Sequence, residues 1–419
     1  MNGSPKQYWL EELNRLVEAI VGTNAFCRKK LEEADALGGF KSLECFRTQM
    51  PFTTKSELAE DQLAHPPYGT FLTYPSTQYT RYHQTSGTSG KPLIWLDDPE
   101  SWQWVLESWK ATWQAAEAKA GESAIFAFSF GPFIGFWAAF DSATQLGMRS
   151  IPAGGMGSAD RLRFIMTQKP TYLCCTPTYA LRLVDVAKEL GIDLSESGVK
   201  CIIVGGEPGG SIPEIRERIE TGWAPAKLLD HHGMTEVGPV SHGDLNNPTI
   251  VRLVHDHFYC EVLDPETDEP VAEGGTGELV LTTLGRYASP LIRYRTRDLV
   301  KPVSVPGEPP ELFLLEGGII GRVDDMVIVR GVNLYPSAVD AIVRSVEGIT
   351  EYQVDIDKRS PLTQVSIRIE TEGDSTMVSE ELQKQFRTAL QMRISVEIVD
   401  AGSLPVFEMK AKRWNIISP

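Results

Sequence analysis

The sequence contains little cysteine, and its cysteines are not spaced for a metal site or a redox pair. There are six in 419 residues, and no two form a CxxC motif. Cys174 and Cys175 are adjacent, but they stand in the apolar run TYLCCTP, which is typical of a buried strand. A chain of this length can bury a large core without disulfide bonds. Sparse cysteines in apolar surroundings favour a reducing compartment, so we expect a cytoplasmic protein.

Basic residues are outnumbered as well. Lys and Arg total 40 against 56 Asp and Glu, which gives a formal net charge of −16. Generic binding to nucleic acid or to an anionic membrane requires a basic face that neutralises phosphate groups. We therefore expect neither partner, although a local basic pocket for one phosphate group stays compatible with the composition.

Long uncharged runs are rare, and one such segment could be either a membrane-spanning helix or part of a buried core. Residues 123–140, SAIFAFSFGPFIGFWAAF, carry no charge and reach the lower length limit of a membrane-spanning helix. Gly131 and Pro132 divide the segment, so we predict a strand, a loop and a buried helix. The N-terminal MNGSPKQYWLEELNRL has mixed charge, which predicts an amphipathic helix and not a signal peptide.

Alternation of strands and helices dominates the rest. From residue 125 to about 230, the apolar runs AIFAFSF, TYLCCT, VKCIIVGG and AKLLDHHG are separated by helical stretches. This order predicts a mostly parallel sheet, with ligands bound beyond the carboxyl ends of its strands. Alternating β runs follow Pro239, and a second αβ pattern begins near residue 321.

The predicted fold is therefore α/β with two domains. The large N-terminal domain covers residues 1–321, of which about 240–321 form a barrel-like β-rich subdomain. A small, mobile α+β domain covers residues 322–419.

Two helix signals are local. Thr54 to Glu57 predict a helix start with an acidic first turn, and Lys55 is expected in solvent, with a nearby phosphate group as the alternative. A helix over about residues 99–118 carries an apolar stripe that we assign to the core, made of Trp102, Val105, Leu106, Trp109 and Trp113.

The loop Thr85–Pro92, TSGTSGKP, could bind an anion. Its small residues let backbone N–H groups approach the ligand, and Lys91 adds a positive charge. It is not the P-loop of nucleotide triphosphatases, because Thr85 replaces the first glycine and Pro92 the final Ser or Thr. An ordinary hairpin turn is the alternative.

The segment Asp230–Glu236, DHHGMTE, follows an apolar strand. A glutamate at a strand end beside a threonine hydroxyl could hold Mg²⁺, which prefers oxygen ligands. The alternative is a helix that begins at Thr235 and Glu236.

Three further charged motifs stay ambiguous individually. Asp298 in YRTRD could accept hydrogen bonds from ribose hydroxyls, or belong to a surface salt-bridge network. GRVDD, residues 321–325, could be a hinge or a polar linker. KAKR, residues 410–413, could place a cation in a cleft or form a solvated basic tail. His242, His255, His257 and Cys260 match no standard zinc spacing, so we predict no metal site there.

The order of the motifs is far more specific than any one of them. TSGTSGKP, GGEP, HGMTE, YRTRDL, GRVDDM followed by GVN and Pro, and a lysine near the C-terminus together resemble the adenylate-forming superfamily. That superfamily contains acyl-CoA synthetases, peptide-synthetase adenylation domains and luciferases. PFTTKSEL, DHFYCEVLDPET and DDMVIVRGVNLYPS are most similar to its phenylacetate-CoA ligase branch. The resemblance runs from about Phe52 to Lys412.

The resemblance implies roles for individual residues. The loop that would hold the β- and γ-phosphates of ATP consists of Thr85, Ser86, Gly87, Thr88, Ser89, Gly90 and Lys91, of which Thr88 and Lys91 would assist catalysis. The adenine pocket would comprise Gly206, Glu207 and Pro208. The residues along the adenylate would be Asp230, His231, His232, Gly233, Met234 and Thr235, with Glu236 as the Mg²⁺ ligand. Asp298, supported by Arg322, would hold the ribose. The acyl pocket would be formed by Phe130, Phe133, Ile134, Gly135, Phe136, Gly205 and His231. Asp324 would be the hinge, Lys410 the adenylation lysine, and residues 331–333 part of the thiol tunnel.

The resemblance also implies the reaction. ATP would activate a carboxylic acid as an acyl-adenylate, from which coenzyme A would take the acyl group. The branch favours an aromatic acid of the arylacetate or benzoate type. Two alternatives remain: an acyl acceptor that is a carrier protein or an amine, and a nucleotide-binding protein without catalysis. The sequence leaves the oligomeric state open, a homodimer included.

One stretch departs from the branch. Residues 404–410 read LPVFEMK where relatives have a PRSxGK-like ending, so Met409 replaces a glycine. Lys412 is the alternative catalytic lysine.

Overall fold

A computed structural model describes residues 4–85, 92–325, 327–329, 332–357, 359, 364–390, 392–405, 407 and 412–417, and every structural statement below refers to them. Five predicted site positions of the phosphate loop, Ser86 to Gly90, lie outside this set, as do Lys91 and Lys410. The side chain of Phe136 lies outside it too.

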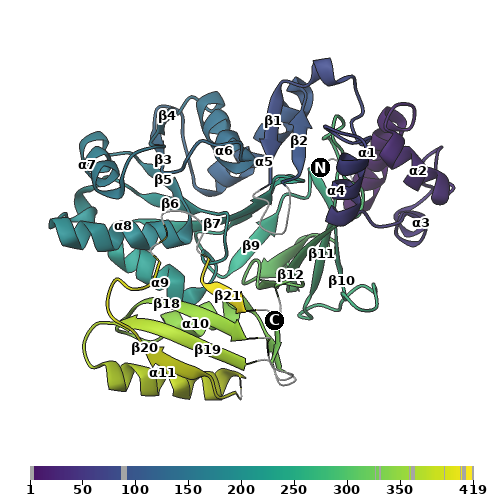
Figure 1. Cartoon of the computed structure of the whole chain (residues 1–419). Coiled ribbons are helices and arrows are strands. Elements are labelled where there is room, and N and C mark those ends of the chain that lie inside the picture. The colour runs from purple at the N-terminus through teal and green to yellow at the C-terminus, as the bar shows by residue number, and fades with distance from the viewer. Residues whose placement is uncertain are drawn as a thin grey trace.

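The chain begins with four helices that pack beside the β-rich part of the large domain (Figure 1). Their bounds are α1 (Pro5–Ile20), α2 (Ala25–Glu33), α3 (Leu43–Gln49) and α4 (Lys55–Ala64). The predicted start of α4 is confirmed, because Thr54 and Glu57 form a reciprocal capping box. Lys55 is thereby fixed as the first residue of α4.

A nine-stranded sheet forms the centre of the large domain, in the order β13-β14-β9-β8-β7-β6-β5-β3-β4. The predicted parallel part is present as β7 (Lys227–Met234), β6 (Cys201–Val204), β5 (Tyr172–Cys175), β3 (Ser123–Phe126) and β4 (Arg149–Pro152). The antiparallel part consists of β8 (Gly238–Gly243), β9 (Ile250–Leu253), β14 (Phe313–Glu316) and β13 (Pro302–Ser304).

Helices cover both faces of the parallel strands, as right-handed crossovers require. One face packs against α7 (Ser158–Gln168), α8 (Pro177–Leu190) and α9 (Pro213–Gly222). The other packs against α5 (Pro99–Ala115) and α6 (Ile134–Gln145). Apolar side chains therefore alternate along each strand between two separate cores. The predicted stripe is buried, and it consists of Trp102, Val105, Leu106, Trp109 and Trp113.

The strands after Pro239 divide between two sheets. A second sheet is fully antiparallel, with β10 (Phe258–Leu263), β11 (Gly277–Thr283), β12 (Tyr294–Val300) and β15 (Gly321–Arg322) in that order. The other strands of this region join the nine-stranded sheet, and a shared apolar cluster fills the space between the two. A hairpin of β1 (Arg81–Gln84) and β2 (Ile94–Asp97) flanks the loop 85–92 on both sides, as predicted.

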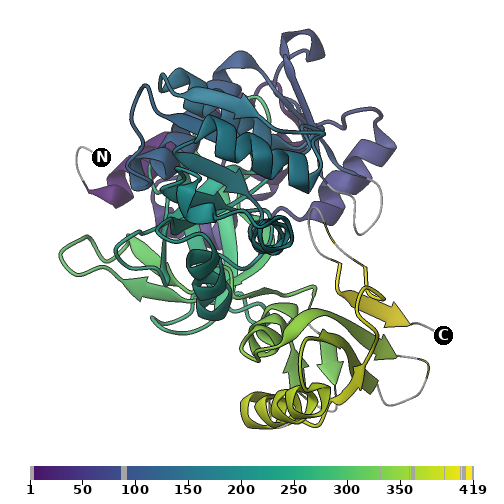
Figure 2. The same ribbon diagram turned by 90° about the vertical axis from the view of Figure 1, so that its left-hand side faces the viewer.

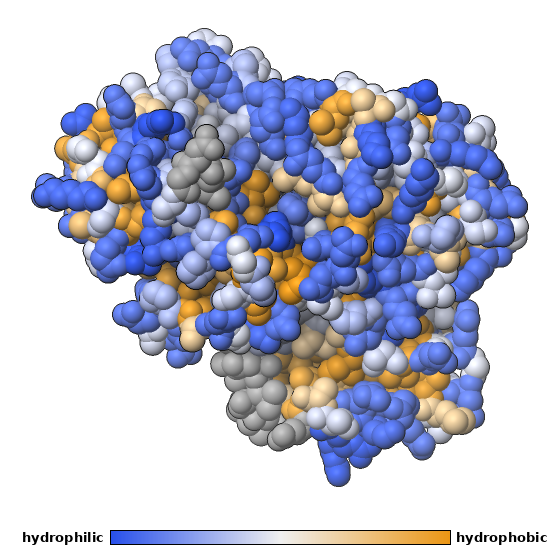
Figure 3. Space-filling view, turned by 180° about the vertical axis from the view of Figure 1, so that it is seen from behind, coloured by the Kyte–Doolittle hydropathy of each residue, from blue (hydrophilic) through white to orange (hydrophobic). Residues whose placement is uncertain are grey.

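The small α+β domain lies below the large one and is set apart from it in the rotated view (Figures 1 and 2). Its elements are β16 (Val327–Val329), β17 (Val332–Leu334), α10 (Pro336–Arg344), β18 (Ile349–Asp357), β19 (Gln364–Thr371), α11 (Ser375–Leu390), β20 (Ser395–Ile398) and β21 (Trp414–Ile417). It has its own core and a sheet in the order β20-β19-β18-β21. Figure 3 shows that apolar side chains also gather on the outside of this domain.

No helix among the described residues is both long and apolar enough to cross a membrane. The uncharged segment 123–140 instead forms β3, a loop and α6, which is the predicted arrangement.

Candidate functional site

A cavity of about 1540 Å³ opens at the carboxyl ends of the parallel strands, where a doubly wound sheet binds its ligands. The segments that follow β3, β4, β5, β6 and β7 all contribute to its wall. Further wall residues come from the start of α4, from α6, from β12 and from the connector to the small domain. The topological expectation from the sequence is therefore confirmed.

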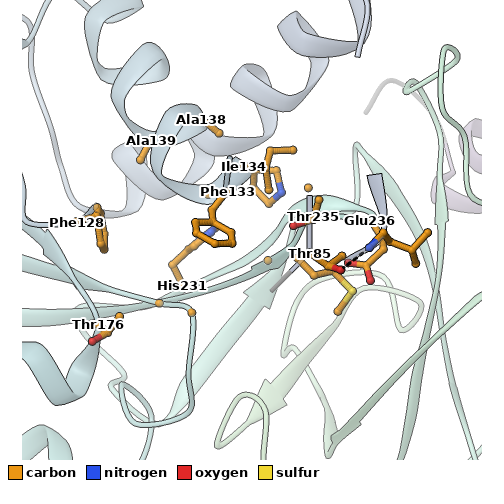
Figure 4. A pocket seen from close by; sticks show the side chains of 18 of the residues that line it. Thr85, Phe128, Phe133, Ile134, Ala138, Ala139, Thr176, His231, Thr235 and Glu236 are labelled. Atoms are coloured by element: carbon orange, nitrogen blue, oxygen red, sulfur yellow. Dashed lines mark hydrogen bonds between the residues drawn. The ribbon is translucent and has the colours of Figure 1, made fainter. Parts of the chain in front are cut away.

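The two ends of the cavity differ in character (Figure 4). Thr85, Thr235 and Glu236 lie at one end, while Phe128 and Thr176 lie at the other. Phe133 and His231 stand between them. The cavity thus joins a polar, charged end to an end with more apolar walls.

Glu236 is the buried carboxylate of the polar end. It is 4% exposed, and its Oε1 lies 2.9 Å from Lys55 Nζ. The hydroxyl of Tyr294 donates to the same oxygen at 3.3 Å. Burial and the neighbouring Glu236 raise the pKa of Tyr294 well above its ordinary value, so this hydroxyl stays a donor. Lys55 was expected in solvent, but it reaches into the site from the capped start of α4.

Arg286 holds the backbone of this end. Its Nη1 donates to the carbonyl oxygens of Thr235 and Glu236 at 3.1 and 3.0 Å. Its other nitrogens bind both carboxylate oxygens of Asp97, at 2.6 and 2.7 Å. Burial alone would raise the pKa of Asp97, but the charge of Arg286 outweighs it and lowers that pKa. Arg286 could not be predicted from the sequence, because no local motif signals a contact across 189 positions.

The segment Asp230–Glu236 continues as strand β7 as far as Met234 and does not begin a helix, so the strand-end interpretation is confirmed. Asp230 is half-buried and is not one of the wall residues. It accepts hydrogen bonds from Ser211 Oγ at 2.6 Å and from the N–H of His231 at 3.0 Å. Burial raises the pKa of Asp230.

Asp298 is buried, with 4% of its surface exposed, and is not a surface residue. Its carboxylate lies between the side chains of His232 and Arg322. His232 Nε2 lies 3.1 Å from its Oδ2, and Arg322 Nη1 lies 2.7 Å from its Oδ1. Arg322 also contacts both carboxylate oxygens of Asp324, at 3.0 and 3.1 Å. The predicted pair of Asp298 and Arg322 is thus in direct contact. Through Arg322, Asp298 on β12 is linked to Asp324 in the segment that leads to the small domain.

His231 forms the middle of the cavity wall. Its Nδ1 lies 3.2 Å from Thr112 Oγ1, and its ring stands edge-on to Trp109 with centroids 3.7 Å apart. Burial lowers its pKa well below the ordinary value, so the imidazole is neutral at pH 7. Trp109 therefore belongs to both the core and the cavity wall. At Gly205, a Cβ atom would lie 2.8 Å from the carbonyl oxygen of His231, so only glycine fits there.

The structure separates the predicted site residues into two groups. Those on the cavity wall are Thr85, Phe133, Ile134, Gly135, Gly205, Gly206, His231, Gly233, Met234, Thr235, Glu236, Arg322 and Asp324. The predicted residues that are not among the wall residues are Phe130, Glu207, Pro208, Asp230, His232 and Asp298. Phe130 packs edge-on against Trp137, and Glu207 accepts a hydrogen bond from the N–H of Thr178 at 2.9 Å.

The described histidines form no metal cluster. Within the described ranges, no group of three or more His, Cys, Asp or Glu side chains could hold a metal ion. His255 Nε2 lies 3.3 Å from the carbonyl oxygen of Phe313, and its ring packs near Trp9. Burial lowers the pKa of His255 to about 4 and that of His257 to about 4.

This burial predicts a loss of stability as the pH falls from 7 to 5. In the unfolded chain each imidazole takes up a proton near pH 6.5, whereas the folded protein keeps His255 neutral down to about pH 4. The unfolded state therefore binds more protons in this window, which lowers the free energy of unfolding by about 2 kcal/mol per histidine at pH 5. Urea unfolding at both pH values measures the effect. The variant His255→Gln should lose about that much of the pH dependence, and an unchanged slope would contradict the assignment.

Two family descriptions match the chain, one in the large domain and one in the small domain. Residues 84–285 match the AMP-binding enzymes, and residues 331–415 match the AMP-binding enzyme C-terminal domain. The first match covers the cavity walls from β1 to Gly285, and the second covers most of the small domain.

Curated relatives match nearly the whole chain. A phenylacetate-coenzyme A ligase of Thermus thermophilus is 32% identical over 93% of this chain and 84% of its own length. Phenylacetate-coenzyme A ligases of Pseudomonas putida and Escherichia coli are 30% and 32% identical, over 97% and 89% of this chain and 92% and 86% of their own lengths.

A solved 2-hydroxyisobutyryl-CoA ligase in the postadenylation state, in complex with 2-HIB-AMP, has a TM-score of 0.90. It is 30% identical, over 98% of this chain and 89% of its own. The same ligase in the thioesterification state, at the same identity and the same coverage of both chains, gives 0.72. The chain belongs to the AMP-binding enzymes of the adenylate-forming superfamily, in the branch of AMP-forming acid–CoA ligases that contains the phenylacetate-CoA ligases.

Proposed function

We propose that this acid–CoA ligase acts on a small aromatic acid with ATP and Mg²⁺. The observation that carries the proposal is a cavity with a charged end at Glu236 and aromatic walls at Phe128 and Phe133. Four phenylacetate-coenzyme A ligases among the relatives support the aromatic preference. A solved relative acts on 2-hydroxyisobutyrate, so the fold itself also accommodates an aliphatic acid.

The reaction needs activation because a carboxylate is a poor electrophile. Attack of its oxygen on the α-phosphorus of ATP forms an acyl-adenylate and releases pyrophosphate, and AMP is then a good leaving group. Negative charge develops on the departing pyrophosphate, so the site must supply cations and N–H donors. Lys55 supplies a cation at the charged end of the cavity, and Thr85, which begins the predicted phosphate loop, lies at the same end.

Glu236 fits a role as the ligand of Mg²⁺. Its carboxylate is buried and presents hard oxygen atoms beside the hydroxyl-bearing Thr235. Bound there, Mg²⁺ would neutralise phosphate charge. Lys55 neutralises the same carboxylate in the structure, so it would turn toward the phosphate oxygens when the ligands bind.

Asp298 would bind the nucleotide, and the connector would allow the small domain to move between the adenylation and the thioester-forming half-reactions. Asp298, held by His232 and Arg322, would accept the ribose hydroxyls. Asp324, bound by Arg322, would be the hinge on which the small domain turns. Rotation would withdraw Lys410 and let the thiol of coenzyme A reach the acyl carbon.

ATP–pyrophosphate exchange with a panel of acids tests the function. We expect exchange with arylacetic or benzoic acids, no exchange without Mg²⁺, and thioester formation with free CoA. Exchange without thioester would move the acceptor to a carrier protein or an amine. ATP binding without exchange for any acid would support the non-catalytic alternative.

The same assay identifies the adenylation lysine. Lys410→Ala should slow exchange at least tenfold, while Lys412→Ala, two positions away, should remain close to the parent. The reverse order would assign the role to Lys412.

A further inference from the structure

Arg161 on α7 is a buried cation in the wall of the cavity. It is 6% exposed, and it lies on the side that carries Met156 and Tyr179. Its Nε and Nη2 donate to the carbonyl oxygen of Ala153 at 3.0 and 2.8 Å, and its Nη1 donates to the hydroxyl of Tyr179. Tyr179 in turn lies within hydrogen-bond distance of Ser158. The guanidinium is therefore held in one orientation.

The charge of Arg161 has no carboxylate partner among the described residues. Buried Arg286 and Arg293 each bind a buried carboxylate through two nitrogens, Asp97 and Glu261 respectively. Arg161 donates to a neutral carbonyl and a hydroxyl and lies over the Tyr179 ring, 4.8 Å from its centroid, and two of its five N–H groups are left without a protein acceptor among the described residues. A buried charge normally acquires a counter-charge, so the cavity itself is the place from which one can come.

Arg161 also lies away from the reactive end. The N–H of Tyr179 donates to Thr176 Oγ1, and Thr176 lies at the end of the cavity opposite Glu236 (Figure 4). The other cationic residues of the described wall are Lys55, Arg295, Arg297 and Arg322, and they belong to α4, β12 and β15. An acid whose carboxyl group is activated near Glu236 would extend its other end past Phe133 and His231 toward Arg161.

We propose that the acid carries a second carboxylate at its far end and that Arg161 binds it. The inference rests on the proposed function and narrows its substrate class to dicarboxylic acids, with an aromatic spacer that fits the walls at Phe128 and Phe133. A charge-assisted pair that uses the two remaining N–H groups would complete the coordination of the guanidinium. Arg161 would then be the residue that selects the substrate, and not a participant in the chemistry.

The test compares shape-matched acids in ATP–pyrophosphate exchange without CoA. Benzene-1,4-diacetic acid is symmetric, so either carboxyl group can be activated, and 4-ethylphenylacetic acid replaces the distal carboxylate by a methyl group. The parent protein should prefer the diacid by about 10–100-fold in kcat/KM, the usual size of a hydrogen bond to a charged group. The variant Arg161→Met keeps an unbranched side chain but removes the guanidinium and its charge, and it should lose this preference. Arg161→Lys should keep part of it.

If Arg161→Met does not fold, the comparison of the diacid with the monoacid in the parent protein still tests whether the substrate carries a second carboxylate. Equal or better use of the monoacid by the parent overturns the proposal. A variant that changes only KM for CoA also overturns it, because Arg161 would then serve the thiol arm. Exchange with apolar monoacids alone leaves the ligase function intact while the substrate class fails. Absence of exchange with every acid would contradict both the proposed ligase function and the proposed substrate class.

Discussion

Replacing Arg286 by methionine is expected to lower the free energy of unfolding by about 3–5 kcal/mol, as removal of one partner from a buried ion pair does. The substitution leaves the carboxylate of Asp97 at 0% exposure without its counter-charge, and it frees the carbonyl oxygens of Thr235 and Glu236. Urea or thermal unfolding measures the loss, and ATP–pyrophosphate exchange should fall in parallel because the backbone at Glu236 loses its support.

Two controls separate this effect from a general loss of charge. Lys384→Met removes a cation from an exposed ion pair with Glu381 and should change stability by less than about 0.5 kcal/mol. The double variant Asp97→Leu with Arg286→Met removes both buried charges and should be less destabilised than the sum of the single variants. Simple additivity would show that the pair is not the source of the stabilisation.

Substituting Glu236 by glutamine should slow ATP–pyrophosphate exchange by about 10²–10³-fold, the range reported for removal of one group that stabilises transition-state charge. The amide keeps the shape of the side chain but loses the negative charge that would attract Mg²⁺ and Lys55. Exchange rates measured across a Mg²⁺ titration should show a higher half-saturating concentration in the variant.

Glu60→Gln is the matched control for Glu236→Gln. Glu60 also lines the cavity, but it is exposed and contributes from α4. Its variant should stay within about twofold of the parent. A loss in Glu236→Gln of less than tenfold, or an equal loss in both variants, would contradict the proposed role of Glu236 as a Mg²⁺ ligand.

Local and periodic features of the fold could be predicted from the sequence. The two cores of the large domain follow from the alternation of apolar residues along β3, β5, β6 and β7, and the position of the cavity follows from the parallel order of these strands. The capping box at Thr54 and Glu57 is a contact over three positions, so the residue types suffice to predict it.

Contacts between distant segments could not be predicted in this way. The alternating runs after Pro239 predict that strands form, but they do not predict which strands pair. In the structure β14 pairs with β9 in one sheet, while β15 pairs with β12 in the other. Lys55 was assigned to solvent because the local pattern shows a polar helix face, whereas its partner Glu236 stands 181 positions away. Arg161 and Arg286 were missed for the same reason.

The pairing of Lys55 with Glu236 also has a practical consequence for anyone who wishes to shorten the protein. Lys55 precedes residue 84, where the AMP-binding match begins, and Tyr294 follows residue 285, where it ends. A fragment trimmed to that match would keep the parallel sheet and Glu236, but it would expose this carboxylate without either of its neighbours. Minimal versions or chimaeras should therefore carry the opening helical segment together with β12, and swapping the central portion alone transplants Glu236 without the two residues that contact its carboxylate.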